Sequence, residues 1–255
     1  MPTKMPQAGG GDLGLIRPDW AVSPRVKTVV TTRNGGVSLG PYSSFNLALH
    51  VADDASAVMK NRAQLRSALH LPQEPGWLQQ VHGTRVVELP AVEAVPEADA
   101  SISRVAGLAC VILTADCLPV LLCDEAGTVV AAAHAGWRGL LNGVLENTIA
   151  AMGCAPRQIC AWLGPAIGPN VFEVGAEVRN AFVQRDARAA AAFRVGMNSE
   201  KFIADLYVLA HLRLSSVGVG RVEGGGECTY TAADRYYSYR RESPCGRMAS
   251  LIWLA

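Results

Sequence analysis

The chain has 255 residues, of which 50% are hydrophobic and 18% are charged, and its 23 basic and 22 acidic side chains leave a net charge of +1. This composition excludes an intrinsically disordered chain, and the near balance of charge argues against electrostatic binding to nucleic acid or to an anionic membrane. A chain of this length can bury roughly three quarters of its surface, so a metal or a disulfide is not needed for folding alone. We expect a soluble globular protein.

Cysteine content and the N-terminus indicate the cytoplasm. The seven cysteines include no CxxC pair, and residues 1–12 contain no apolar run of the kind found in signal peptides. We therefore predict that residues 1–12 form a flexible tail. Residues 105–123 are mostly apolar, but Asp116 lies near the centre, where it would cost about 2.5–3.5 kcal/mol in a bilayer. Two buried strands explain this stretch better than a membrane span.

In chain order, the β-branched run of residues 27–32 predicts a strand that ends at the Asn34-Gly35-Gly36 turn. Residues 55–71 predict a helix, because apolar residues recur at helical spacing and Asp53 and Asp54 lie at its start. Three apolar runs follow, and we expect buried strands at residues 108–113, 119–123 and 128–133.

Predicted strands and helices also alternate in the second half of the chain. A helix is expected over residues 141–152, a strand over 159–163, and a helix through Val174, Val178 and Phe182. Asp205 is a plausible N-cap for a last helix that ends near Gly218. Because several neighbouring strands are joined by turns too short for a helical crossover, we predict one α/β domain of the α+β type, with a mixed sheet, over residues 13–255.

Three separate side chains are candidates for a metal site. His82 and His134 each lie beside a glycine at a break in the chain, and Cys117 lies between two predicted strands. Two imidazoles and one thiolate suit Zn²⁺ with its fourth position open. The spacing matches no zinc-finger pattern, so two alternatives stay open: a buried free cysteine near two loop histidines, or a Cys–His nucleophile pair oriented by Asn46 or Asp116.

Polar side chains that could contact a substrate are few. Arg138 lies at the predicted start of a helix, where free backbone N–H groups favour an anion, and Arg62 lies within the helix of residues 55–71. Asn46 is a further candidate. A solvated surface arginine is the alternative explanation for each of the two arginines. The remaining histidines, His50, His70 and His211, have ordinary explanations in loops and helices.

Eight segments together resemble the YfiH family, also called the laccase-domain or polyphenol oxidase family, which includes the peptidoglycan editing factor. They span most of the chain: residues 31–38 (TTRNGGVS), 43–54 (SSFNLALHVADD), 61–62 (NR), 79–86 (QQVHGTRV), 114–124 (TADCLPVLLCD), 131–140 (AAAHAGWRGL), 164–175 (GPAIGPNVFEVG) and 236–242 (YYSYRRE). The segments AHAGWRG and TADCLPVLL are the most specific of these.

The resemblance implies an α/β/β/α sandwich in which His82, Cys117 and His134 bind one metal ion, usually zinc. It also implies a purine nucleoside enzyme that phosphorolyses adenosine, inosine, guanosine or methylthioadenosine and deaminates adenosine. On this basis we expect Cys117, His82 and Arg62 in catalysis, and Asn46, Arg62 and Arg138 in binding the nucleoside and phosphate. The chain would be a monomer or a homodimer.

Older descriptions call the family copper polyphenol oxidases. A trinuclear copper cluster would require roughly eight imidazoles beyond those of a mononuclear centre, and the chain has five histidines. A multicopper laccase is therefore excluded, whereas a single copper ion in the His₂Cys site, oxidising phenols, is not. A hydrolase or amidase that edits peptidoglycan precursors through Cys117 is a further alternative, and a binding module without activity is another.

Overall fold

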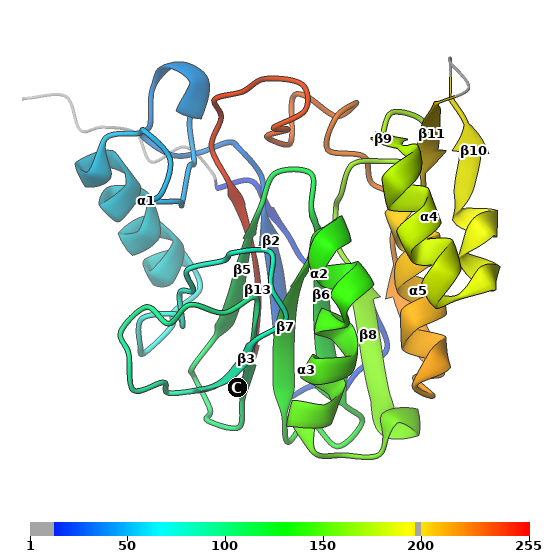
Figure 1. The fold of residues 1–255 in the computed structure, drawn as a ribbon. Helices are drawn as coiled ribbons and strands as arrows, with labels where there is room; N and C mark the ends of the chain where they lie inside the picture. Colours follow the sequence, from blue (N-terminus) through cyan, green and yellow to red (C-terminus); the bar gives the residue numbers. More distant parts are fainter. Residues whose placement is uncertain (1–12, 197–199) are drawn as a thin grey trace, which may run out of the picture.

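A computed structural model describes residues 13–196 and 200–255, so the predicted tail of residues 1–12 lies outside the described residues. The chain forms four layers, helix, sheet, sheet and helices, which confirms the predicted sandwich (Figure 1). The helices are α1 (Ala55–Ala68), α2 (Trp137–Asn142), α3 (Val144–Met152), α4 (Ala176–Arg185) and α5 (Leu206–Ser216), with 3₁₀ helices η1 (Gly40–Tyr42), η2 (Pro156–Gln158) and η3 (Ala187–Ala192). The strands are β1 (Leu15–Ile16), β2 (Val26–Thr31), β3 (Val86–Leu89), β4 (Ala100–Ser103), β5 (Cys110–Thr114), β6 (Leu118–Asp124), β7 (Val130–Ala135), β8 (Ile159–Leu163), β9 (Glu173–Gly175), β10 (Phe193–Val195), β11 (Lys201–Ala204), β12 (Arg221–Gly224) and β13 (Met248–Leu254).

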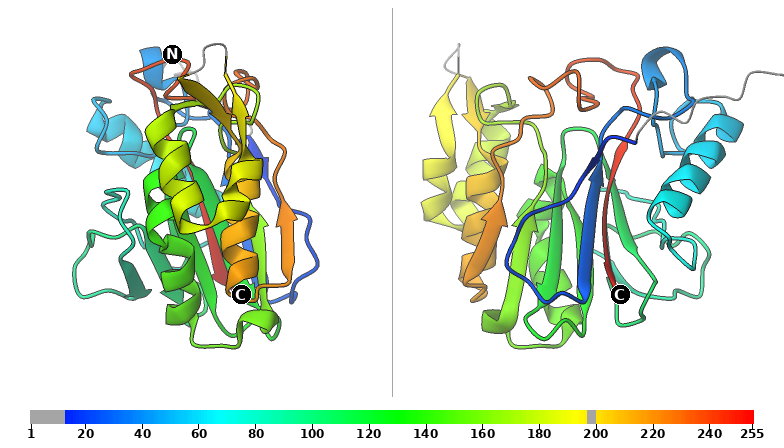
Figure 2. Two further views of the ribbon diagram at one scale, coloured as in Figure 1. Left: turned by 45° about the vertical axis from the view of Figure 1, so that its right-hand side comes forward. Right: turned by 180° about the vertical axis from the view of Figure 1, so that it is seen from behind.

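Two sheets form the centre of the molecule. The first has four antiparallel strands in the order β1-β2-β13-β5, so the last strand of the chain lies between β2 and β5 (Figure 2, right). The second has six strands in the order β12-β8-β6-β7-β4-β3, with parallel pairing at β12–β8 and β3–β4 and antiparallel pairing elsewhere. The predicted mixed sheet is therefore confirmed. A small sheet, β10-β11-β9, adjoins α4.

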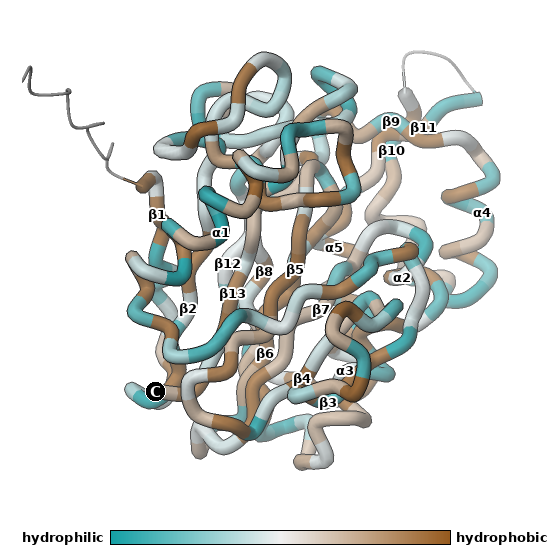
Figure 3. The backbone as a smooth tube through the Cα atoms, turned by 90° about the vertical axis from the view of Figure 1, so that its left-hand side faces the viewer, coloured by the Kyte–Doolittle hydropathy of each residue, from teal (hydrophilic) through white to brown (hydrophobic). Residues whose placement is uncertain are grey.

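Strand β6 is buried on both faces, which explains its continuous apolar sequence. Because side chains alternate along a strand, Leu121 and Cys123 pack between the two sheets, whereas Val120 and Leu122 pack in the core cluster that includes α3 and α5. A third apolar cluster lies between α1 and the four-stranded sheet. Hydrophobic residues are concentrated along the central strands (Figure 3).

Most predicted bounds differ from the structure by one to three residues, and three differences affect the description of an element. The helix expected over residues 141–152 is divided into α2 and α3 at Gly143, whose φ of 105° lies in the left-handed region that glycine adopts without strain. Val174 belongs to β9, and only Val178 and Phe182 of the expected apolar face lie on α4. Strand β7 extends to Ala135, so His134 lies inside the strand.

The predicted N-cap Asp205 is confirmed, and of the two aspartates expected at the start of the first helix, Asp54 is its N-cap. The side chain of Asp54 accepts a hydrogen bond from the Ser56 N–H at the start of α1, and Asp205 accepts from the N–H groups of Tyr207 and Val208 at the start of α5. Within the described residues, no helix combines the length and apolar character needed to cross a membrane.

The contact between the two sheets gives a test of the core. Replacing Leu121, which is fully buried between them, with Ala should lower the free energy of unfolding by about 2–5 kcal/mol, because the cavity would be surrounded by packed strands. Replacing the fully exposed Val92 with Ala should change it by less than about 0.5 kcal/mol. Equilibrium denaturation in urea measures both, and equal effects would contradict the described packing.

Candidate metal centre

Three side chains from distant parts of the sequence converge at one end of the six-stranded sheet. Pro119 of β6 pairs with His134 of β7, so Cys117, two residues before Pro119, lies close to His134. His82 comes from the loop between α1 and β3. The candidate ligand atoms of His82, Cys117 and His134 all lie within 4.8 Å of one another. The predicted convergence of the three residues is confirmed.

The backbone holds two residues of this region in the left-handed conformation. His82 has a φ of 61° and Asp116, next to Cys117, has a φ of 88°. Such conformations cost about 1–3 kcal/mol in residues other than glycine and persist where the surroundings determine them. Both oxygens of Asp116 accept hydrogen bonds, one from the Thr229 hydroxyl at 2.6 Å and one from the Arg240 N–H at 2.7 Å. Asp116 therefore fixes the turn that carries Cys117.

Hydrogen bonding selects the tautomer of His134. Its Nδ1 lies 2.8 Å from a carboxylate oxygen of the fully buried Asp99, so Nδ1 carries the proton and donates it. Nε2 of His134 is left to face Cys117 and His82. The two imidazole rings are 4.7 Å apart between centroids and lie edge to face at 68°.

The charges of the centre favour a thiolate in the metal-free protein. Burial alone would raise the pKa of Cys117, but neighbouring His134 and His82 lower it to about 6. Burial alone would lower the pKa of His134, but the charge of Cys117 and the hydrogen bond to Asp99 raise it to about 9. Each group therefore favours the charged form of the other in the metal-free protein, and a metal cation would take the place of a proton between them.

The residues fit a tetrahedral metal ion. Zinc bonds of 2.3 Å to sulfur and 2.0–2.1 Å to nitrogen imply ligand atoms about 3.6 Å apart, and Cys117 Sγ lies 3.7 Å from His82 Nε2. Gly136 keeps this space clear, because an added Cβ there would lie 3.0 Å from both Cys117 Sγ and His82 Cδ2. Three ligands leave one position open, and the His₂Cys set suits zinc or copper.

The centre lies on the wall of a cavity of about 520 Å³. Within the described residues, the ionisable side chains on this wall are three arginines, one carboxylate, three histidines, the Cys117 thiol and the Tyr239 phenol. The remaining wall consists mainly of aromatic and apolar residues. The lining residues are His50, Gln80, His82, Leu113, Thr114, Ala115, Asp116, Cys117, His134, Trp137, Arg138, Ile167, Phe172, Tyr239, Arg240 and Arg247.

Of the expected substrate-binding residues, Arg138 lines the cavity, whereas Arg62 and Asn46 do not. Arg62 is buried with its guanidinium 3.7 Å above the Trp77 ring, and its Nε donates to the Leu47 carbonyl at 2.9 Å. It lines a separate hollow beside α1. Direct contact of Arg62 with a substrate stays a prediction.

Asn46 is fully buried and saturated by hydrogen bonds. Its oxygen accepts from the N–H groups of Ala48 and Arg247, and its amide donates to the carboxylate of Asp53. Asn46 and Arg62 thus hold the 46–50 segment, which carries His50, and Asn46 also holds Arg247. Contact of Asn46 with a substrate also stays a prediction.

The sequence interpretation assigned no role to several cavity residues, including Trp137, Phe172 and four others. His50 was interpreted as an ordinary loop residue, and Tyr239, Arg240 and Arg247 received no role. Burial and the nearby charges of Arg247 and Arg62 lower the pKa of His50. His50 therefore lies in a partly desolvated environment with nearby positive charge. The available signal was that His50 and Arg240 fall within segments that carry the family resemblance; Arg247 lies outside them.

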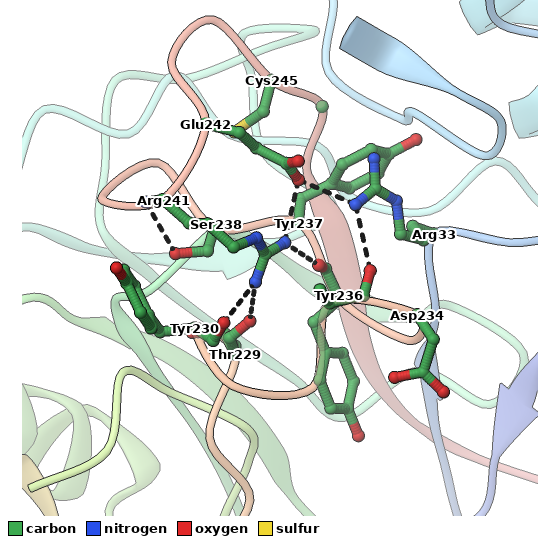
Figure 4. Close-up of polar contacts among 12 residues, drawn as sticks. Arg33, Thr229, Tyr230, Asp234, Tyr236, Tyr237, Ser238, Arg241, Glu242 and Cys245 are labelled. Atoms are coloured by element: carbon green, nitrogen blue, oxygen red, sulfur yellow. Dashed lines mark hydrogen bonds and ion pairs between the residues drawn. The ribbon is translucent and has the colours of Figure 1, made fainter. Parts of the chain in front are cut away.

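A network of polar contacts fixes the loop that carries Tyr239 and Arg240 (Figure 4). The guanidinium of Arg241 donates to the carbonyls of Thr229, Tyr230 and Tyr236, and to Glu242 at 2.8 Å. Glu242 also pairs with Arg33 at 2.8 Å, which links the loop to the segment after β2. Partly buried guanidinium groups therefore stabilise this side of the cavity.

The thiolate can be tested in the metal-free protein. Alkylation of Cys117 by iodoacetamide should reach half its maximal rate near pH 6 and slow as the pH falls below it, because only the thiolate reacts. Burial raises the pKa of Cys110 to about 12, so that thiol should stay unmodified across the same range. Peptide mapping by mass spectrometry reports each site. A half-maximal rate at Cys117 near pH 8.5 would contradict the described electrostatics.

The need for open space next to Cys117 and His82 can be tested by adding a methyl group at Gly136. Gly136→Ala should weaken zinc binding at least tenfold, because its Cβ would contact Cys117 Sγ and His82 Cδ2. Gly220→Ala is the matched control, since an added Cβ there meets no atom within 4 Å. Competition with a chromophoric chelator measures the affinities, and unchanged binding by the Gly136 variant would place the metal elsewhere.

Comparison with known proteins identifies the family. The sequence model described as multi-copper polyphenol oxidoreductase laccase matches residues 27–255. A purine nucleoside phosphorylase of Pseudomonas aeruginosa is 54% identical over 239 residues, covering 94% of this chain and 98% of the relative. The purine nucleoside phosphorylase YfiH of Escherichia coli is 52% identical over 241 residues, with coverage of 94% and 98%.

Solved structures agree with this assignment. A Neisseria meningitidis protein, with 51% identity, superposes with a TM-score of 0.90 over 94% of this chain and 99% of its own. The structure of YlmD from Geobacillus stearothermophilus, with 27% identity, has a TM-score of 0.81 over 91% and 92% of the two chains. The chain therefore belongs to the multi-copper polyphenol oxidoreductase laccase family, the YfiH family that its sequence resembles.

Proposed function

We propose that this chain is a zinc-dependent purine nucleoside phosphorylase. The observation that carries the proposal is a His₂Cys centre with one open position, facing a cavity whose wall holds three arginines. Relatives at 52–54% identity are named purine nucleoside phosphorylases. Zn²⁺ held by His82, Cys117 and His134 would supply Lewis acidity towards an oxygen ligand at its open position.

Phosphate is the first substrate for which the cavity is suited. Arg138, Arg240 and Arg247 bring three permanent positive charges to the wall, and guanidinium groups bind phosphate oxygens through paired N–H donors. Asp116 is the one acidic side chain among the described lining residues, and both of its oxygens already accept hydrogen bonds. The cavity therefore favours a dianion.

Aromatic side chains provide the surface for a purine. Trp137, Phe172 and Tyr239 line the same cavity, and Tyr239 is exposed. Stacking on an aromatic ring is worth about 1–3 kcal/mol per nucleobase and depends little on which base is bound. A volume of about 520 Å³ lies within the range of small-molecule sites.

Phosphorolysis transfers the ribosyl group from the purine to phosphate. The C1′–N9 bond breaks, a bond forms between C1′ and an oxygen of hydrogen phosphate, and the departing purine nitrogen takes up the proton that the hydrogen phosphate loses. The arginines hold the phosphate and neutralise its charge as it approaches C1′. We assign Asn46 and Arg62 the role of holding the segment that carries His50, and Asn46 that of holding Arg247 as well.

Adenosine deamination is a second reaction of the proposed site, and the geometry supports it less. Zinc deaminases use a carboxylate that is not a metal ligand to move protons. In the described part of the cavity that group would be Asp116, whose oxygens are occupied by Thr229 and Arg240. We therefore rank phosphorolysis above deamination.

The residues do not support multicopper oxidase chemistry, despite the name of the family model. All five histidines lie in the described residues, and His70 and His211 line no part of the cavity. A trinuclear cluster would need several more imidazoles than the remaining three histidines supply.

A product assay tests the proposal. Zinc-loaded protein incubated with adenosine and phosphate should release adenine and ribose 1-phosphate, which chromatography resolves from inosine. Cys117→Ala should lower the bound zinc and the rate of product formation together, at least 100-fold for the rate, because one ligand is lost. Cys154→Ala, which removes a half-buried thiol outside the cavity, should leave both unchanged.

The products separate the alternatives. Inosine alone would favour the deaminase, and quinone formation from phenols by copper-loaded protein would favour an oxidase. Turnover of none of these substrates would overturn the proposal and leave the hydrolase or amidase acting on peptidoglycan precursors. A Cys117→Ala variant that keeps its zinc but loses activity would indicate a nucleophilic cysteine instead.

A further inference from the structure

One buried carboxylate contacts both histidines of the centre. Asp99 lies directly before β4 and is fully buried. Its Oδ1 accepts from His134 Nδ1 at 2.8 Å and from the His82 N–H at 2.9 Å. Its Oδ2 accepts from the Gly83 N–H at 2.6 Å and from the Val81 N–H at 3.2 Å. The two histidines are thus joined through a single side chain.

The backbone of Asp99 strengthens the same link. Its carbonyl accepts the His134 N–H at 2.7 Å, so Asp99 holds both the main chain and the ring of His134. Its side chain approaches Gly83 closely, and a Cβ added at Gly83 would lie 3.3 Å from Oδ2. Asp99 therefore fixes the 81–83 loop relative to the His134 imidazole.

Burial of this carboxylate is costly unless its charge is compensated. Removing an ionised carboxylate from water costs several kcal/mol even after relaxation. The partners of Asp99 in the described residues are one imidazole and three backbone N–H groups, and no lysine or arginine forms an ion pair with it. Such an arrangement compensates the carboxylate through directional hydrogen bonds, one from the His134 ring and three from the backbone.

We propose that Asp99 is the positioning residue that sets the geometry of both histidine ligands, an inference that rests on the proposed metal site. By holding the proton on Nδ1, it directs Nε2 of His134 towards the metal position. By accepting three successive N–H groups, it stabilises the left-handed conformation of His82. Without it, the ring of His134 can rotate and the 81–83 loop can relax away from Cys117.

The substitution Asp99→Asn tests this role with little change of shape. The amide nitrogen replaces one acceptor oxygen, so at least one of the four hydrogen bonds at the carboxylate is lost and two donors face each other. Loss of such an outer partner lowers metal affinity by about 10–100-fold. We expect this loss for zinc, measured by chelator competition, together with a changed visible absorption spectrum of the Co²⁺-substituted protein.

Asp124→Asn is the matched control. Asp124 is also buried, and its carboxylate accepts from the Thr128 N–H, the Thr128 hydroxyl and the Val129 N–H at the opposite end of β6. This variant should lose stability by a similar mechanism while its zinc affinity and Co²⁺ spectrum stay as in the wild type. Equal zinc loss in both variants, or none in Asp99→Asn, would overturn the proposal.

A measurement on the wild-type protein does not depend on either variant folding. Imidazole ¹H–¹⁵N NMR of the zinc-loaded protein should show His134 protonated at Nδ1 and metal-bound at Nε2. Coordination through Nδ1 would overturn the role of Asp99. Zinc binding with these signatures but without nucleoside turnover would contradict the proposed function and leave the role of Asp99 in place. Failure to bind zinc would overturn both.

Discussion

The antiparallel pairing of β6 with β7 is the constraint on which the site depends. It places Cys117 and His134 at the same end of the six-stranded sheet, although 16 residues of strand and turn separate them along the chain. Both strands are buried on both faces, so a shift of register would disrupt the packing on both faces as well as separate the two ligands. The packing that stabilises the sandwich therefore also maintains the centre.

Around these two strands, polar side chains mainly form hydrogen bonds that hold neighbouring segments together. Gln80 pairs its carboxamide with both backbone groups of Leu113, at 2.9 and 2.8 Å, in the manner of an additional strand residue. Asp116 joins the Cys117 turn to the loop that carries Arg240. Because buried polar groups cost free energy unless they are paired, these saturated contacts make the site rigid before any ligand arrives.

The sequence predicted the strands and helices with strong periodicity and, through the family resemblance, the three candidate ligands. It did not show that residues 248–254 insert between β2 and β5, because this pairing joins opposite ends of the chain. Nor did it distinguish Arg138, which lines the cavity, from Arg62, which stacks on Trp77. Residue type reveals a charge, whereas its role depends on the partners that tertiary structure supplies. Asp99 was missed for the same reason.

The cavity side chains most available to a substrate are those that are not already saturated by hydrogen bonds within the protein. The carboxamide of Gln80 and the carboxylate of Asp116 are occupied by the protein itself. Arg138 is exposed and contacts the ring of Trp137, and Tyr239 extends into solvent at the cavity. The accessible surface is therefore cationic and aromatic, which suits an anion and a planar heterocycle together. A reaction that joins phosphate to the sugar of a purine nucleoside requires both, whereas hydrolysis of an amide requires neither.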